Sequence, residues 1–243
     1  MSVVKVKLFT DSRGRNLQHK LEEHSPPDNN VEWETHVLPG ATLETVEKKI
    51  ERTRRRENWD ITIIIAGICN FTHRVTSRKG KFLEYSQRKA DSTQDEINRI
   101  LQNLGETTYI CTITPADMSK FSHQRNGDAD LEIEQQHLLE DIENTNRFIK
   151  EKSVERDTPT IDLAIQSYTK SLKKQGPKNK KIIKFSGKEL PDGIHPSIAL
   201  EEIWAKYIIK VTTTIINKLN REPEDSTDES EPDTGNFKRS RRN

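Results

Sequence analysis

Three residues of this sequence, Ser12, Asp192 and His195, have the types and spacing needed for covalent catalysis. A serine hydroxyl is a weak nucleophile until a base accepts its proton, and histidine is suited to that role near neutral pH. A carboxylate three residues before the histidine can orient the imidazole by accepting a hydrogen bond from its other ring nitrogen. The three residues would therefore serve as nucleophile, orienting acid and base of an acyl-transfer site.

Each of these residues also has an ordinary structural interpretation. The run TDSRG at residues 10–14 is typical of a turn that caps a helix, with Arg13 as a solvated turn residue. Asp192–Gly193 is a common tight turn, and His195 could cap or pack against the helix that follows it. The positions of these residues relative to the strands must decide between the two interpretations.

Five segments have the apolar, β-branched composition of strands. They are Val3–Phe9, Val31–Leu38, Trp59–Gly67, Thr107–Thr114 and Lys180–Phe185. The third and fourth contain the continuous runs ITIII and YICTI, which favour burial on both faces of a parallel sheet.

Segments with helical spacing of apolar residues alternate with these strands. The main ones are Leu43–Asn58, Asp91–Gly105, Leu131–Lys152 and Ile198–Leu219. The alternation predicts a doubly wound α/β sandwich with about five parallel strands.

Polar residues and glycines follow the ends of the predicted strands, and these ends meet at one edge of a parallel sheet. Ser12 follows the first strand, Gly40 the second and Asn70 the third, while Asp192 and His195 follow the fifth. The backbone N–H groups of Ser12 and Gly40 and the side-chain amide of Asn70 could form an oxyanion hole. Gly40 after Pro39 is equally typical of a type II turn.

This arrangement resembles the SGNH hydrolase superfamily, the GDSL-type lipases and esterases. That family has Gly-Asp-Ser after the first strand, a glycine after the second, Gly-x-Asn-Asp after the third and Asp-x-x-His near the C-terminus. The corresponding residues here are Asp11 and Ser12, Gly40, Gly67 with Asn70, and Asp192 with His195. The resemblance covers Val3 to Lys218 and implies a flavodoxin-like three-layer α/β/α sandwich without a metal or organic cofactor.

Two positions depart from the family pattern. Thr10 stands where the first block usually has glycine, and Asn70 follows Gly67 by three residues rather than two. With one extra residue in the loop, Asn70 supplies the third oxyanion donor, as we expect. With strict spacing, Cys69 occupies that position and one donor is missing, at a cost of about 10²- to 10³-fold in rate.

The resemblance implies a serine esterase that acts through an acyl-enzyme. Ser12 would attack the ester, His195 would transfer the proton, and Asp192 would orient His195. The segment from His73 to Asp91 is rich in Lys and Arg and has little apolar surface. This composition fits a small acyl group or an anionic ester better than a long-chain lipid.

Two alternatives belong to other functional classes. SGNH-like domains with a similar first block occur in retroelement proteins, so the chain could be a weakly active or inactive binding and assembly module of a viral or mobile-element protein. The chain could also bind nucleic acid, which would require its two basic stretches to lie on one face. These stretches are Arg52–Asn58 and Lys170–Lys181, and the second is predicted to be a basic loop that leads into the fifth strand. Neither stretch contains an aromatic residue on which a base could stack, which argues against recognition of single-stranded nucleic acid.

Composition sets further expectations. The chain has 243 residues, a net charge of +1 and two cysteines without zinc-finger spacing, so we expect no structural zinc or disulfide framework. It has neither a signal peptide nor an apolar run of the ~20 residues that span a bilayer, which predicts a cytoplasmic or nuclear protein. One domain over residues 1–220 should precede a disordered tail, 221–243, whose acidic-to-basic sequence could bind a protein or an anionic surface.

Overall fold

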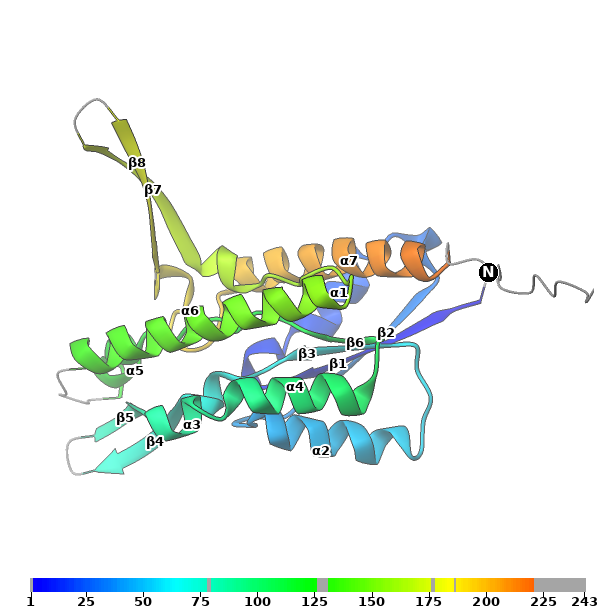
Figure 1. Cartoon of the computed structure of the whole chain (residues 1–243), viewed down its shortest axis with the longest axis horizontal. Helices are drawn as coiled ribbons and strands as arrows, with labels where there is room; N and C mark the ends of the chain where they lie inside the picture. The colour runs from blue at the N-terminus through cyan, green and yellow to red at the C-terminus, as the bar shows by residue number, and fades with distance from the viewer. Residues whose placement is uncertain (1, 78–79, 126–130, 176–177, 186, 221–243) are drawn as a thin grey trace, which may run out of the picture.

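Four parallel strands form the central sheet of the computed structural model (Figure 1). In spatial order they are β2 (Val31–Val37), β1 (Val4–Thr10), β3 (Ile61–Ile65) and β6 (Thr108–Ile110). The structure describes residues 2–77, 80–125, 131–175, 178–185 and 187–220. The predicted tail, 221–243, lies outside the described residues.

Helices cover both faces of this sheet, as Figure 1 shows. One face carries α1 (Leu17–His24) and α7 (Ile198–Leu219), and the other carries α2 (Leu43–Arg54), α4 (Thr93–Leu104) and α6 (Glu132–Glu155). Successive side chains of a strand point to opposite faces, so Ile63 packs with the first group of helices and Ile64 with the second. The predicted three-layer α/β/α sandwich is confirmed.

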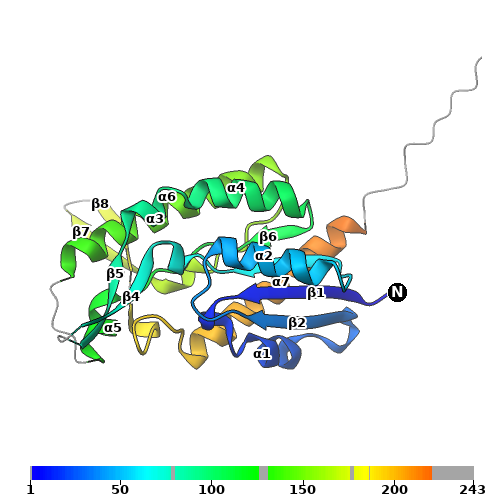
Figure 2. The same ribbon diagram turned by 90° about the horizontal axis from the view of Figure 1, so that it is seen from below.

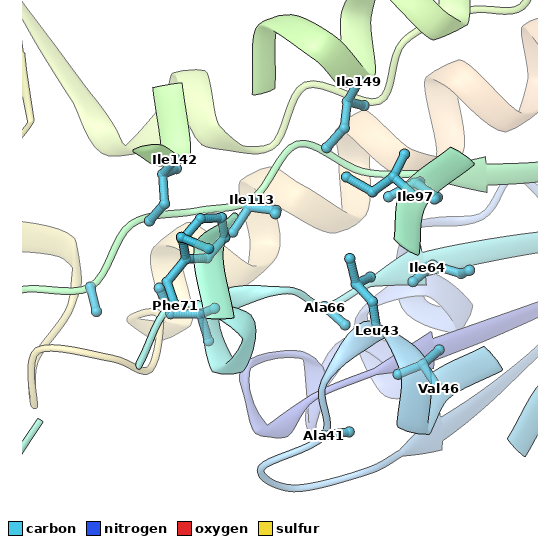
Figure 3. Close-up of a cluster of buried hydrophobic side chains, with 14 of the residues drawn as sticks. Ala41, Leu43, Val46, Ile64, Ala66, Phe71, Ile97, Ile113, Ile142 and Ile149 are labelled. Carbon is cyan, nitrogen blue, oxygen red and sulfur yellow. The ribbon is translucent and has the colours of Figure 1, made fainter. Parts of the chain in front are cut away.

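Both faces of β3 are buried, which explains its uninterrupted apolar run. Figure 3 shows Ile64 of β3 within the larger core cluster, together with Leu43 of α2, Ile97 of α4 and Ile149 of α6. Helices that cannot be stable alone are held in place by this shared apolar contact.

The predicted fifth strand lies outside the sheet. Lys180–Phe185 is part of β8 (Lys178–Phe185), which pairs antiparallel with β7 (Tyr168–Gln175) in a hairpin that projects from the sandwich (Figure 1). The predicted basic loop is therefore largely strand. Three lysines in the run KKIIKF would be costly in a strand buried on both faces, which is a physical reason for this placement.

An irregular segment, residues 161–164, lies instead beside the residues that follow β6. The Thr112 N–H donates to the Ile161 carbonyl at 3.0 Å, and the Ala164 N–H donates to Thr112 Oγ1 at 2.9 Å.

A second hairpin and two short helices, none of them predicted, gather beyond the carboxyl ends of the sheet strands (Figure 2). They are β4 (Thr72–Ser77), β5 (Gly80–Tyr85), α3 (Gln87–Ala90) and α5 (Met118–His123). Leu83 of β5 is 2% exposed and belongs to the core cluster shared with α2, α4 and α6, so the hairpin is anchored to the sandwich.

The two basic stretches do not share a face. The C-terminal end of α2 and the β7–β8 hairpin lie at opposite ends of the molecule in Figure 1. None of the helices in the described part of the chain is both long and apolar enough to cross a membrane.

Replacing Ile64 by Ala should lower the free energy of unfolding by about 2–5 kcal/mol, because the side chain is fully buried and its loss leaves a cavity. Urea unfolding monitored by circular dichroism measures this change. Ile133→Ala on α6 is the matched control, since Ile133 is 69% exposed and its loss should change stability by less than about 0.5 kcal/mol. Equal losses in the two variants would contradict this account of the core.

Candidate active site

The turn that follows β1 is held by a buried ion pair between Asp11 and Arg13. The Asp11 carboxylate accepts the Arg13 backbone N–H at 2.9 Å and pairs with the Arg13 guanidinium, also at 2.9 Å. Arg13 Nη1 donates to the Thr114 carbonyl beyond β6 at 2.5 Å. The expectation of a solvated Arg13 is therefore wrong, because the adjacent carboxylate neutralises the guanidinium and allows its burial.

Close packing also fixes the course of this turn, which forms the 3₁₀ helix η1 (Ser12–Gly14). A Cβ atom on Gly14 would lie 2.3 Å from Oγ1 of the buried Thr10, so only glycine fits there. Thr10 Oγ1 itself donates to the Asp11 carbonyl at 3.1 Å. Ser12 is the half-buried residue that this turn presents at the carboxyl edge of the sheet.

The loop that carries Asp192 and His195 docks against the start of α5. The Asp117 N–H donates to the Gly193 carbonyl at 2.7 Å. Gly193 has φ +84°, and a Cβ atom there would lie 2.4 Å from the Asp117 carbonyl oxygen and 2.6 Å from the Phe121 nitrogen. Glycine at 193 thus permits both the left-handed backbone and the close approach of α5.

The two loops bring Ser12, His195 and Asp192 into one hydrogen-bonded chain. Ser12 Oγ lies 2.9 Å from His195 Nε2, and His195 Nδ1 lies 2.7 Å from Asp192 Oδ2. Because an ionised carboxylate only accepts, Nδ1 carries the proton and Nε2 is free to accept from the serine hydroxyl. This is the tautomer in which histidine can act as a general base.

Backbone hydrogen bonds hold Asp192 in its ionised form. Asp192 Oδ1 accepts the N–H groups of His195 at 2.8 Å and Ile194 at 3.0 Å. Burial alone would raise the pKa of Asp192, but these bonds and the imidazole bond outweigh it and hold the pKa well below its usual range.

Arg125 is a further partner of Asp192 that the sequence analysis missed. Its Nη2 lies 3.3 Å from Asp192 Oδ2, and its guanidinium lies over the Phe121 ring at 3.7 Å from the centroid. Arg125 Nη1 also donates to the Phe121 carbonyl at 3.2 Å. No local motif marks this arginine, because it reaches the site only through the packing of α5.

Asn16 and Glu201 form a second connection between the loops that the sequence did not indicate. Asn16 Nδ2 lies 3.0 Å from each carboxylate oxygen of Glu201 on α7. Burial raises the pKa of Glu201, although the Asn16 bond opposes that rise. The turn after η1 is thereby tied to the helix that follows His195.

Ser12 opens onto a cavity of about 420 Å³, and Gly40 and Cys69 also line it. Gly40 has φ +74° in the loop between β2 and α2. Neither the Ser12 N–H nor the Gly40 N–H donates to another residue in the described part of the chain. Two of the three predicted oxyanion donors therefore border the same cavity.

Asn70, the third predicted donor, does not line this cavity. It is 3% exposed, and its Oδ1 accepts the Leu43 N–H at 2.9 Å while its Nδ2 donates to Glu96 Oε2 at 2.7 Å. The 3₁₀ turn η3 (Ile68–Asn70) directs this amide toward α2 and α4, and Cys69 faces the cavity instead.

The Cys69 thiol is poorly suited to act as a second nucleophile. Burial and the nearby Asp11 carboxylate raise its pKa, so the thiolate is disfavoured. Within the described residues, no group of three or more His, Cys, Asp or Glu side chains is arranged to hold a metal ion.

Solved structures with the same architecture include several hydrolases. The lipase/acylhydrolase from Enterococcus faecalis is 16% identical, with 87% of this chain and 96% of that chain covered and a TM-score of 0.57. A GDSL-like lipase from Bacteroides thetaiotaomicron is 12% identical, with 88% of each chain covered and a TM-score of 0.56. The chain has the SGNH hydrolase fold.

An acetylxylan esterase from Geobacillus stearothermophilus has the same SGNH fold, with 12% identity, 86% of this chain and 94% of that chain covered and a TM-score of 0.55. No protein-family model and no curated protein matches the sequence. The likeness to the SGNH structures therefore concerns the fold, and activity has to be argued from the site.

The depressed pKa of Asp192 predicts a pH-dependent contribution to stability. Wild type should be more stable than Asp192→Asn at pH 7, because only the carboxylate gains from the native hydrogen bonds. As the pH falls from 5 to 3, this advantage should shrink, because the pH passes the ordinary carboxyl pKa of about 3.8 on the way to the native pKa. Urea unfolding of both proteins at pH 7, 5 and 3 measures the difference. If the stability advantage of wild type at pH 3 equals that at pH 5, the native pKa of Asp192 is not depressed as described.

Proposed function

We propose that the protein is a serine esterase that hydrolyses a small ester through an acyl-enzyme intermediate. The observation that carries this proposal is the hydrogen-bonded chain from Ser12 through His195 to Asp192, which opens onto the cavity at the carboxyl edge of the sheet. The SGNH fold, shared with structures named as lipase, acylhydrolase and esterase, supports it.

The reaction would proceed in two steps. Ser12 Oγ attacks the ester carbonyl while His195 Nε2 accepts its proton, and the imidazolium then donates that proton to the departing alcohol as the C–O bond breaks. In the second step His195 takes a proton from water, which attacks the acyl-enzyme. Collapse of this intermediate releases the acid and returns the proton to Ser12. Asp192 stabilises the imidazolium in both steps.

The backbone N–H groups of Ser12 and Gly40 would stabilise the oxyanion in this mechanism. Ser12 and Gly40 both border the cavity, and no hydrogen bond from either N–H is found among the described residues, so both groups could stabilise a developing negative charge. Asn70 would act differently, since its amide supports the first turn of α2 through Leu43. The proposed oxyanion hole thus consists of two backbone donors.

A fluorophosphonate probe tests the activated serine without knowledge of the substrate. Wild type should be labelled, Ser12→Ala should not, and His195→Ala should label at least 10³-fold more slowly because Ser12 loses its base. Ser153→Ala on α6 and His19→Ala on α1 are matched controls, because neither residue lines the cavity, and both should label like wild type. Absence of labelling in folded wild type would contradict the proposal and favour the binding-module alternative.

Asn70→Ala distinguishes a structural role from an oxyanion role. We expect a loss of about 1–3 kcal/mol in the free energy of unfolding, because the buried Leu43 N–H loses its acceptor. The labelling rate of the folded variant should stay within about ten-fold of wild type. A drop of 10²-fold or more in a folded variant, the cost typical of a lost oxyanion donor, would instead place the Asn70 amide in the oxyanion hole.

A further inference from the structure

The cavity beside Ser12 has a strongly cationic wall. Arg15 follows η1, Arg74 lies on β4 and Lys89 lies on α3, and all three side chains line the cavity. None of the described residues that line it is an Asp or a Glu. The whole chain has 40 basic and 39 acidic residues, so this local excess of positive charge does not follow from the overall composition.

No carboxylate neutralises these three cations among the described residues. Lys48 pairs with Glu44 and Lys206 with Glu202, whereas no carboxylate in the described part of the chain pairs with Arg15, Arg74 or Lys89. His73 also lines the cavity, but its Nε2 lies 3.1 Å from Glu84, which is outside the lining.

Arg15 lies closest to the reacting groups. Its Nε donates to the Ser12 carbonyl at 3.2 Å, and its Nη2 lies 3.3 Å from His195 Nε2. A guanidinium only donates, so Arg15 shares the single lone pair of the unprotonated Nε2 with the Ser12 hydroxyl, which lies closer.

Arg74 on β4 and Lys89 on α3 supply the positive charge on the side of the cavity that the β4–β5 hairpin and α3 form. Arg74 lies over the Phe121 ring at 5.6 Å from the centroid. Both cations act on the same lining residue, Cys69, where they oppose the effects of burial and of Asp11 on the thiol. Arg74 on β4 pairs with Leu83 on β5, and Lys89 on α3 is followed by Ala90. Leu83 and Ala90 both belong to the core cluster, so they hold the two cations near the cavity.

We infer that the substrate of this site is a small ester that carries a carboxylate or a similar anionic group. This inference rests on the proposed esterase function and adds the chemical class of its substrate. The ester would lie at Ser12, its short apolar part would contact Ile68, Leu83 and Ile194, and its anion would face Arg74 and Lys89. Cations grouped around a cavity of about 420 Å³ lie within one Debye length of a bound anion and attract it together.

Two pairs of esters test this inference and distinguish the half of the substrate that carries the charge. For the alcohol half, 4-acetoxybenzoate is compared with its neutral methyl ester. For the acyl half, the mono-4-nitrophenyl ester of glutaric acid is compared with its methyl ester. In both pairs release of the phenol is measured. At least one anionic ester should have a kcat/KM about ten-fold or more above that of its neutral partner, and 0.5 M NaCl should reduce this preference.

A double variant locates the source of the preference. Arg74→Gln/Lys89→Gln should reduce the preference to less than about three-fold while Ser12 still reacts with the fluorophosphonate. The matched control is Lys81→Gln/Arg88→Gln, which removes the same charge from β5 and α3 at two residues outside the cavity lining, and it should keep the wild-type preference. A preference that is equal in the two double variants would overturn the inference.

The outcomes separate this inference from the proposed function. If wild-type Ser12 is labelled but neither pair shows a preference, the anionic substrate is wrong and the esterase stands. If Ser12 is not labelled, the binding of 4-acetoxybenzoate and of its methyl ester to Ser12→Ala is compared by titration calorimetry. Selective binding of the anion, lost in Arg74→Gln/Lys89→Gln, would uphold the anion site without hydrolysis. Equal or absent binding would overturn the inference.

Discussion

The buried ion pair between Asp11 and Arg13 is the constraint on which the candidate site depends. It closes the turn after β1 through Asp11 and reaches the segment after β6 through Arg13, so it ties together the ends of two strands. A buried pair of this kind costs several kcal/mol when one partner is removed, because the other charge is left uncompensated. The direction in which Ser12 is presented is thus set by electrostatics beneath it rather than by Ser12 itself.

Ser12 and His195 are 183 positions apart in the sequence, yet proton transfer between them tolerates little error in distance. Three contacts limit that error. Gly193 lets the later loop dock on Asp117, Arg125 holds the Asp192 carboxylate from α5, and Asn16 ties the first turn to Glu201 on α7. The first two contacts come from the two ends of α5 and the third from α7, so rotation of either loop would break at least one of them.

Much of the architecture could be predicted because β3 and the segment around β6 have the continuous apolar runs that doubly covered parallel strands need, while β1 and β2 are rich in β-branched and aromatic residues. The nucleophile, base and orienting acid could also be proposed, since their roles require particular side chains at the ends of strands. The surroundings could not be predicted. The burial of Arg13 depends on a carbonyl 101 residues away, and Asn70 turns inward because Leu43 and Glu96 offer its amide two partners. Such partners come from tertiary packing and leave no local pattern.

In the proposed reaction the cations that line the cavity have two different roles. Arg74 and Lys89 would contact a part of the substrate that does not change during the reaction, so they would stabilise the bound ester and the transition state equally and act mainly on KM. Arg15 lies beside Ser12 and His195, where the charge does change. A cation there would favour negative charge on the reacting oxygen and oppose positive charge on His195, so Arg15 would act on kcat through the balance of these two effects. The positive field that selects an anionic ester would thus also favour negative charge on the reacting oxygen.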